Sequence, residues 1–97
     1  MMEGIFYEII YSDEYLYDIE RHQKAGQKII LKKIATFLLE LKENPTTGIG
    51  QVELLKGYGE RNVYSRRIDK KHRLIYEVFE EEKCVEILSA YGHYDDK

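Results

Sequence analysis

Apolar and polar residues repeat with two different periods along this chain, and the change of period predicts where helices give way to strands. The first apolar run, residues 5–11, is β-branched and aromatic, so we expect a strand that is buried on much of both faces. Ser12 or Asp13 can cap a helix that continues to about Lys24. Ala25-Gly26 then provides the stop.

A second helix is predicted from about residue 27 to residue 43. Its apolar positions recur at intervals of three and four and form one stripe: Ile30, Ile34, Phe37, Leu38 and Leu41. Such a stripe must face a sheet or another helix. Because the two helices are joined by a short turn, they should form an antiparallel pair.

The second half of the chain has the period of strands. Residues 44–50 contain the only proline and two glycines, and they predict a loop before a short strand at 51–55. Residues 64–78 predict two strands joined by a charged turn, and residues 84–89 predict a last strand. In the second strand of the 64–78 hairpin, alternate residues belong to opposite faces: Leu74, Tyr76 and Val78 on one, and Arg73, Ile75 and Glu77 on the other.

The order of these elements is β, α, α, β, β, β, β, which predicts an α+β fold in a single domain, residues 1–97. We expect a curled antiparallel sheet with the helix pair packed on one face and the other face open. The last three strands should be sequential neighbours. The N-terminal strand could add at an edge or insert between others, and the pattern leaves both arrangements open.

Composition narrows the class of protein. Charged residues make up 34% of the 97 residues and hydrophobic residues 43%, a balance typical of globular proteins in solution. No apolar run approaches the ~18 residues of a membrane span, and the start of the chain lacks the pattern of a signal peptide, so we expect a cytoplasmic protein. The lone Cys84 has no partner for a disulfide, and we interpret it as a packing residue.

Charge is distributed unevenly. The net charge is -3, yet five of the fifteen residues in 64–78 are Lys or Arg. A local cluster of cations suits an anionic partner, and phosphate is the first to consider. The alternative is a solvated hairpin whose cations protect a strand edge from aggregation. The nine tyrosines can pack at the edge of a core or stack on bases, and composition does not distinguish these roles.

Three residues carry candidate chemistry. Metal-free RNA cleavage needs a base for the 2′-hydroxyl, an acid for the departing 5′-oxygen and a cation for the phosphorane. Glu53, Arg73 and His93 supply these types and could converge on such a sheet. The three histidines are far apart in sequence and form no metal motif with Cys, Asp or Glu. We therefore expect no metal and no other cofactor.

The motif around the charged hairpin resembles a known family. Residues 64–78 read YSRRIDKKHRLIYEV. This is similar to the YoeB toxins, a branch of the RelE/ParE superfamily, with their aromatic-Ser-Arg-Arg-Ile, a charged turn and His-Arg-Leu-[Val/Ile]-Tyr. Residues 52–56 resemble the Glu-x-Leu-Lys strand of that family, and residues 91–94 resemble its terminal His-Tyr pair. The likeness covers roughly residues 9 to 94.

The resemblance implies a RelE-like fold and the toxin of a type II toxin–antitoxin system. Such a toxin is a ribosome-dependent, metal-independent mRNA endoribonuclease that cleaves at the A-site codon and inhibits translation. It also implies a YefM-like antitoxin as partner, besides the ribosome and mRNA. A homodimer is a further expectation, which rests on this likeness and on the apolar, tyrosine-rich helix pair.

Carried over position by position, the resemblance implies catalytic roles for four residues. Glu53 would be the general base and Arg73 the cation that stabilises the phosphorane. His93 would be the general acid, and Tyr94 would orient or stack the nucleotide. Three cations would bind RNA: Lys56, Arg66 and Arg67. Their role would be to position the protein on the phosphate backbone. We interpret His72 as a turn residue.

Three departures from the family pattern stand out. The 56–64 connection is one residue longer, Tyr64 replaces the commoner Trp, and Asp95-Asp96-Lys97 follows the tyrosine that normally ends the chain. Two alternative functions remain open. One is a ParE-like toxin that inhibits gyrase by binding, which would not need Glu53, Arg73 and His93 together. The other is a catalytically silent protein that only binds an antitoxin.

Overall fold

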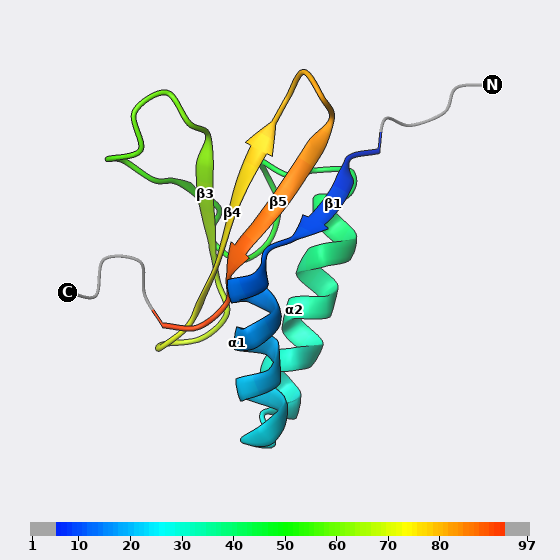
Figure 1. Ribbon diagram of the computed structural model, residues 1–97, viewed down its shortest axis with the longest axis vertical. Coiled ribbons are helices and arrows are strands. Elements are labelled where there is room, and N and C mark those ends of the chain that lie inside the picture. Colours follow the sequence, from blue (N-terminus) through cyan, green and yellow to red (C-terminus); the bar gives the residue numbers. More distant parts are fainter. Residues whose placement is uncertain (1–5, 93–97) are drawn as a thin grey trace.

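The computed structural model describes residues 6–92, which form a helix pair and a five-stranded sheet (Figure 1). The helices are α1 (Asp13–Lys24) and α2 (Lys28–Leu41). The strands are β1 (Glu8–Tyr11), β2 (Glu53–Leu54), β3 (Val63–Arg67), β4 (Arg73–Phe79) and β5 (Cys84–Ser89). The predicted α+β fold is confirmed. The second predicted strand, 51–55, is reduced to the two residues of β2.

The strands follow the order β1-β5-β4-β3-β2. The last four strands pair antiparallel with their sequence neighbours, as expected for strands joined by short connections. β1, however, pairs parallel with β5, so the sheet is mixed and not wholly antiparallel. Parallel strands need a long connection between them. Here the connection from β1 to β5 contains both helices and the strands β2, β3 and β4.

The N-terminal strand is an edge strand, and the prediction that it is buried on both faces is wrong. β1 has a hydrogen-bonding neighbour on one side only, and Ile10 and Tyr11 are each 44% exposed. Among the residues of β1, Ile9 packs against the core. The β-branched composition thus reports strand propensity here and says little about burial.

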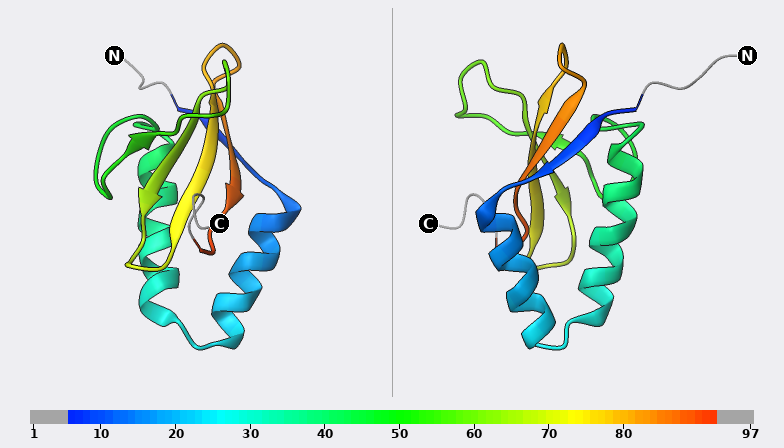
Figure 2. Two further views of the ribbon diagram at one scale, coloured as in Figure 1. Left: turned by 90° about the vertical axis from the view of Figure 1, so that its left-hand side faces the viewer. Right: turned by 45° about the vertical axis from the view of Figure 1, so that its right-hand side comes forward.

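Local capping explains where the helices begin and end. The Ser12 hydroxyl accepts a hydrogen bond from the Tyr15 N–H at 3.1 Å, which is the N-cap interaction that begins α1. Gly26 has a φ of +69°, a left-handed conformation that suits glycine and ends the helix before α2. The far ends of both helices, joined by this turn, project beyond the sheet (Figures 1 and 2).

The main core lies between the helix pair and one face of the sheet. The predicted apolar stripe of α2 is confirmed, because Ile30, Ile34, Phe37 and Leu41 are all buried. The sheet contributes Leu74, Tyr76 and Val78 from β4 and Val85 and Ile87 from β5. These β4 residues are the ones that sequence alternation assigned to one face.

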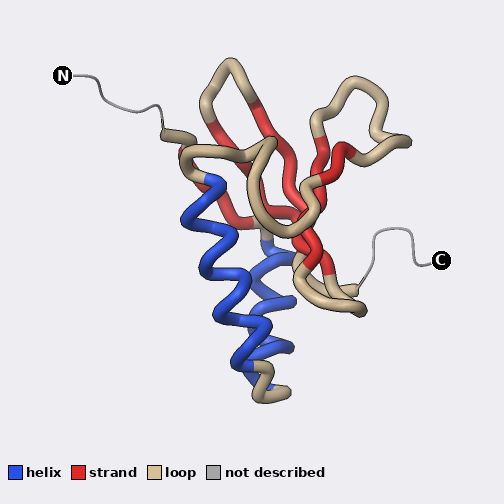
Figure 3. Tube along the Cα trace, turned by 180° about the vertical axis from the view of Figure 1, so that it is seen from behind, coloured by secondary structure: helices blue, strands red, loops and turns tan. Residues whose placement is uncertain are grey.

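The opposite face is partly covered. Leu55, Val63 and Ile75 form a second, smaller apolar cluster, against which Tyr58 and Leu88 pack. Tyr58 belongs to the connection between β2 and β3. We call this side of the sheet, with Glu53, Arg67 and Arg73 around the small cluster, the open face. The loop from α2 to β2 links the helix layer to the strands and is seen clearly from behind (Figure 3).

Candidate functional site

The register of the sheet brings three of the sequence-predicted site residues to the open face. Glu53 is opposite Ser65 in the β2–β3 pair, and Ser65 is opposite Ile75 in the β3–β4 pair. Arg67 is directly opposite Arg73, one two-residue step further along. Residues that pair across strands share a face, and so do residues two apart in one strand. Glu53, Arg67 and Arg73 therefore lie on one side of the sheet.

Strand geometry gives the spacing of this group. Glu53 and Arg73 are separated by two strand spacings and one two-residue step, which places their Cα atoms about 12 Å apart. A glutamate and an arginine can reach toward a phosphodiester between them across that separation. The two facing arginines repel each other, because like charges directly opposite in a sheet are destabilising. An anion bound between them would relieve that repulsion.

A cavity of about 410 Å³ lies on the same face, next to the end of the described chain. Its lining includes Tyr58, Ile75, Leu88, Tyr91 and Gly92. Two tyrosines and two aliphatic side chains make walls on which a nucleobase could stack. The cavity is adjacent to Arg73, since Ile75 lies two residues along the same strand.

The last described residue, Gly92, is bound to the start of β4. Its carbonyl accepts a hydrogen bond from the Arg73 N–H at 3.0 Å. Its own N–H donates to Nδ1 of His72 at 2.9 Å. The described chain thus ends beside Arg73. His93 and Tyr94, two of the predicted catalytic residues, lie outside the described residues.

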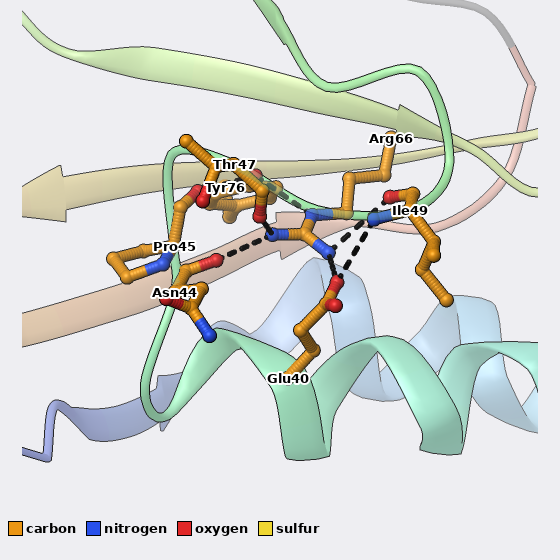
Figure 4. A network of polar contacts seen from close by, with 7 residues as sticks. All are labelled: Glu40, Asn44, Pro45, Thr47, Ile49, Arg66 and Tyr76. Carbon is orange, nitrogen blue, oxygen red and sulfur yellow. Dashed lines mark hydrogen bonds and ion pairs between the residues drawn. The ribbon is translucent and has the colours of Figure 1, made fainter.

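Arg66 has a different environment from the one expected for an RNA-binding residue. Its side chain is fully buried on the helix side of the sheet. The guanidinium donates to the carboxylate of Glu40 and to the Tyr76 hydroxyl (Figure 4). Further bonds run to the carbonyls of the α2–β2 loop: Asn44, Thr47 and Ile49.

These contacts make Arg66 a structural residue of the α2–β2 loop. Every nitrogen of its guanidinium donates to a protein oxygen, and a side chain with no exposed surface cannot reach RNA in this conformation. The expectation that Arg66 faces RNA therefore does not fit the structure. The Tyr76 hydroxyl extends the network by donating to the Pro45 carbonyl at 2.7 Å. Together these bonds fix the loop that leads into β2 and Glu53.

The other predicted RNA-binding residues are accessible. Lys56 is exposed and follows Leu55, whose N–H donates to the Val63 carbonyl at 2.8 Å and whose side chain is buried. Arg67 is half-buried and lines a second cavity of about 350 Å³. Lys33 of α2 and Lys70 of the β3–β4 turn line this cavity too. Asp69 lines it as well, so three cations and one carboxylate surround this cavity beside Arg67.

At the opposite end of the open face, charge is balanced. The Arg61 guanidinium donates to Oε1 of Glu77 through two nitrogens, at 2.8 and 3.2 Å. This ion pair neutralises a nearly buried carboxylate. The end of the face that carries Arg67 and Arg73 is thus the more electropositive one.

Comparison with known proteins identifies the family. Residues 11–94 match the model of the YoeB-like toxin of bacterial type II toxin–antitoxin systems. The chain belongs to the YoeB-like toxins. It is 38% identical to the toxin RelK of Mycobacterium tuberculosis over 71 residues, which are 72% of this chain and 79% of that protein. It is also 32% identical to a YoeB toxin of Streptomyces coelicolor over 73 residues, 75% of this chain and 83% of the relative.

Solved structures agree with this assignment. The YoeB dimer of Staphylococcus aureus superposes with a TM-score of 0.77 at 34% identity, covering 91% of this chain and 98% of that one. The same toxin in its heterotetrameric complex with the YefM antitoxin gives a TM-score of 0.73 over the same shares. An archaeal RelE–RelB complex from Pyrococcus horikoshii, at 21% identity and a TM-score of 0.73, shows the RelE-like fold.

The sequence missed one part of this YoeB-like site. Asp18, His22 and His72 are all buried. His72 lies in the β3–β4 connection, as expected of a turn residue, but its burial was not expected. Tyr15, Asp18 and His22 recur at three and four along α1, so helical spacing could have shown that they share its inner face. Nothing in the sequence could have shown that His72 meets them, because its ring packs against His22 across 50 positions of the chain.

The described part of this YoeB-like toxin has neither a metal-binding cluster nor a membrane-spanning helix. Between residues 6 and 92, no three His, Cys, Asp or Glu side chains are grouped so that they could hold a metal ion. No helix within that same range is long and apolar enough to cross a membrane.

Proposed function

We propose that this YoeB-like toxin is a ribosome-dependent mRNA endoribonuclease that cleaves at the A-site codon and stops translation. The observation that carries the proposal is the placement of Glu53, Arg67 and Arg73 on the open face, beside the point where the described chain ends. That face offers a carboxylate, two cations and a cavity with aromatic walls. These features suit one nucleotide and its phosphate.

In the proposed mechanism, the Glu53 carboxylate removes the proton of the 2′-hydroxyl, and the O2′ atom attacks the adjacent phosphorus. Arg73 stabilises the charge of the phosphorane. His93 protonates the departing 5′-oxygen, and Tyr94 orients the nucleotide. The products are a 2′,3′-cyclic phosphate and a 5′-hydroxyl. Proton transfer and charge stabilisation come from side chains, so the mechanism needs neither a bound metal nor another cofactor.

Lys56 and Arg67 are proposed to bind the RNA backbone. Both are accessible: Arg67 is directly opposite Arg73, and Lys56 follows β2, three residues after Glu53. Phosphate contacts of this kind position a protein without reading sequence. Arg66 takes no part in this proposal, because its donors are all bound within the protein.

The test is cleavage of mRNA on programmed ribosomes by the purified toxin. Arg73→Ala should slow cleavage by about 10² to 10³-fold through loss of phosphorane stabilisation. Glu53→Ala and His93→Ala should each cost about 10² to 10⁴-fold while ribosome binding is largely kept. The losses should not add, because the groups act as a unit. Unchanged cleavage by the Arg73→Ala and His93→Ala proteins would rule out this site.

The same experiment separates the alternatives. A gyrase inhibitor would block DNA replication before protein synthesis, and a silent antitoxin-binding protein would block neither. Cleavage of naked RNA as fast as ribosome-bound RNA would contradict the ribosome dependence. Removing Asp95-Asp96-Lys97 tests whether these residues restrain the reaction, and a large gain in rate would show that they do.

A YefM-like antitoxin is the proposed protein partner, as the S. aureus toxin was crystallised with YefM. An acidic antitoxin segment would gain charge pairing with Arg67 and Arg73 while covering the small apolar cluster of the open face. Co-expression with a neighbouring antitoxin gene should yield a complex that survives purification. Separation of the two proteins at low salt would contradict the pairing.

A homodimer is proposed on separate grounds. The helices expose several large apolar side chains, among them Leu16, Tyr17, Ile29 and Leu39. Such surface marks interaction sites when it is contiguous, and the S. aureus YoeB protein was solved as a dimer. Light scattering over a range of concentrations should give a dimer mass, and a monomer mass throughout would contradict it.

A further inference from the structure

The segment 90–92, which follows β5 and precedes His93 in the sequence, is held by side chains from α1 and from His72, the residue before β4. The Ala90 N–H donates to Oδ2 of Asp18 at 2.9 Å. The Ala90 carbonyl lies 2.9 Å from Nε2 of His22. The Gly92 N–H donates to Nδ1 of His72 at 2.9 Å. Three consecutive positions of the chain are thus fixed at both ends by buried side chains.

These three side chains have almost no contact with solvent. Asp18 is 2% exposed, His22 is fully buried and His72 is 6% exposed. Burying polar groups costs free energy unless hydrogen bonds compensate, and each of these three side chains has one hydrogen bond to the backbone of the 90–92 segment. Asp18 also forms an ion pair with Arg21, at 3.6 Å. An apolar core would have avoided that cost. The presence of Asp18, His22 and His72 in the core is therefore best explained by their hydrogen bonds to the 90–92 segment.

The backbone partners define which nitrogen of each imidazole carries a proton. A carbonyl can only accept, so Nε2 of His22 must donate to Ala90. An N–H can only donate, so Nδ1 of His72 must be the bare, accepting nitrogen. Nδ1 of His22 is buried and has no hydrogen-bond partner among residues 6–92, which disfavours a proton there. Each ring thus has one defined tautomer.

Aromatic contacts complete the arrangement. The two imidazole rings meet edge to face, with their centroids 4.8 Å apart. The Tyr91 ring lies 5.0 Å from His22 and 4.6 Å from His72, measured between centroids. The guanidinium of Arg21 is 3.4 Å from the centre of the Tyr91 ring. The segment is therefore restrained through its side chain as well as through its backbone.

We propose that Asp18, His22 and His72 are positioning residues: they fix the 90–92 segment and so hold Gly92, the residue that precedes the proposed general acid His93 in the sequence, beside Arg73. The inference rests on the function proposed above for His93 and Tyr94. The Arg73 N–H bond to Gly92 makes the link direct, because the same residue bears the proposed phosphorane-stabilising cation. A displacement of about 1 Å in a catalytic group can cost about 10²-fold in rate.

Paired substitutions test this role. His22→Leu removes the donor to Ala90, whereas His22→Gln retains an N–H near the position of Nε2. His72→Leu removes the acceptor for Gly92, whereas His72→Asn retains an acceptor near the position of Nδ1. We expect each Leu variant to lose about 10²-fold in kcat with KM changed less than about threefold. The Gln and Asn variants should recover most of that loss, which a mere packing role would not predict.

A second measurement is independent of activity. In the Leu variants, the amide hydrogens of Ala90 and Gly92 should exchange with solvent at least about tenfold faster, while those of central β4 residues stay protected. Lys24→Ala changes an exposed residue of α1 and serves as the matched control, with no effect on either measurement. Unchanged exchange at Ala90 and Gly92 in both Leu variants would overturn the proposal.

The unmodified protein provides a test that needs no variant to fold. Nitrogen-15 NMR of the imidazoles near neutral pH should show both rings protonated at Nε2, and a proton on Nδ1 of His72 would overturn the proposal. The outcomes also separate this inference from the proposed function. If the wild-type toxin does not cleave RNA but its exchange and tautomers are as expected, the function is wrong and the attachment of the segment stands.

Discussion

Arg66 and Arg67 are adjacent in β3 and chemically identical, yet they lie on opposite faces of the sheet and have opposite environments. Arg66 is fully buried and donates to the side chains of Glu40 and Tyr76 and to carbonyls of the α2–β2 loop. Arg67 is half-buried on the open face, directly opposite Arg73. The strand period of two is the whole cause of this difference.

The comparison shows how one motif can serve stability and function together. The Ser-Arg-Arg sequence places one cation inside, where it holds the loop leading to Glu53, and one outside, where it can meet an anion. A buried guanidinium is costly unless every donor is satisfied, and the acceptors here are three loop carbonyls, the Glu40 carboxylate and the Tyr76 hydroxyl. The loop, in turn, has no regular structure of its own and depends on Arg66.

The largest expected effect is the loss of the buried cation. Arg66→Met should lower the free energy of unfolding by about 3 to 5 kcal/mol, because the loop carbonyls lose their donors and the Glu40 carboxylate loses its partner. Arg67→Met is the matched control and should change it by less than about 1 kcal/mol. Urea unfolding of both variants measures the difference. Equal losses would contradict the separation of roles.

The next effect concerns the loop that Arg66 holds. Gly50 has a φ of +90°, and a Cβ atom added there would lie 2.7 Å from Cζ of the buried Phe37. Gly50→Ala should therefore cost about 2 to 4 kcal/mol, from backbone strain and overpacking together. Gly57→Ala is the control, with a φ of +93° and nothing within 4 Å of the added atom. It should cost only the backbone strain, about 1 to 2 kcal/mol.

A smaller, pH-dependent effect is expected at the turn between β3 and β4. Oδ1 of Asp69 accepts from the N–H groups of Lys71 and His72, both at 2.8 Å. Burial opposes ionisation of this carboxyl, but the two N–H bonds and the nearby imidazoles outweigh it and lower its pKa. Because the folded-state pKa is the lower one, the stabilisation is present above about pH 4 and is lost as the pH falls through the folded value.

Asp69→Asn tests this dependence. The amide oxygen still accepts hydrogen bonds but carries no charge, so the variant should be about 1 kcal/mol less stable near neutral pH. The difference should disappear in acid, where the wild-type carboxyl is protonated. Thermal unfolding from neutral pH down to about pH 2 follows the difference through the lowered folded-state pKa of Asp69. A difference that is the same at every pH would show that the charge is not involved.

Sequence periodicity predicted most of this fold because the spacing of apolar residues along a helix or strand determines which of its faces is buried. The stripe of α2 and the alternation of β4 both correspond to the faces seen in the structure. It failed for β1, because β-branched residues favour an edge strand as much as a central one. It also failed for Arg66, because a charged residue is expected outside unless its partners are known. Those partners are mostly loop carbonyls, with Glu40 and Tyr76, and no sequence pattern shows that they meet Arg66.

The candidate site also has a part that the sequence predicted and a part that it did not. Glu53 and Arg73 could be placed on one face from the strand period and the family motif, and the register agrees. The attachment of the 90–92 segment could not be foreseen. It depends on Asp18 and His22 of α1 meeting a segment about 70 residues away in the sequence, and such contacts follow only from the assembled fold.

The smallest expected effect on stability is also the sharpest test of the open face. Arg67→Gln should change the free energy of unfolding by less than about 0.5 kcal/mol, since the amide can keep much of the packing. If Arg67 contacts one phosphate, the slope of log binding constant against log salt for ribosome binding should decrease in magnitude by about 1. Arg61→Gln, at the ion-paired end of the same face, should leave that slope unchanged. An unchanged slope for Arg67→Gln would mean that Arg67 does not bind the RNA backbone. Arg66 and Arg67 would then differ only in their contribution to stability.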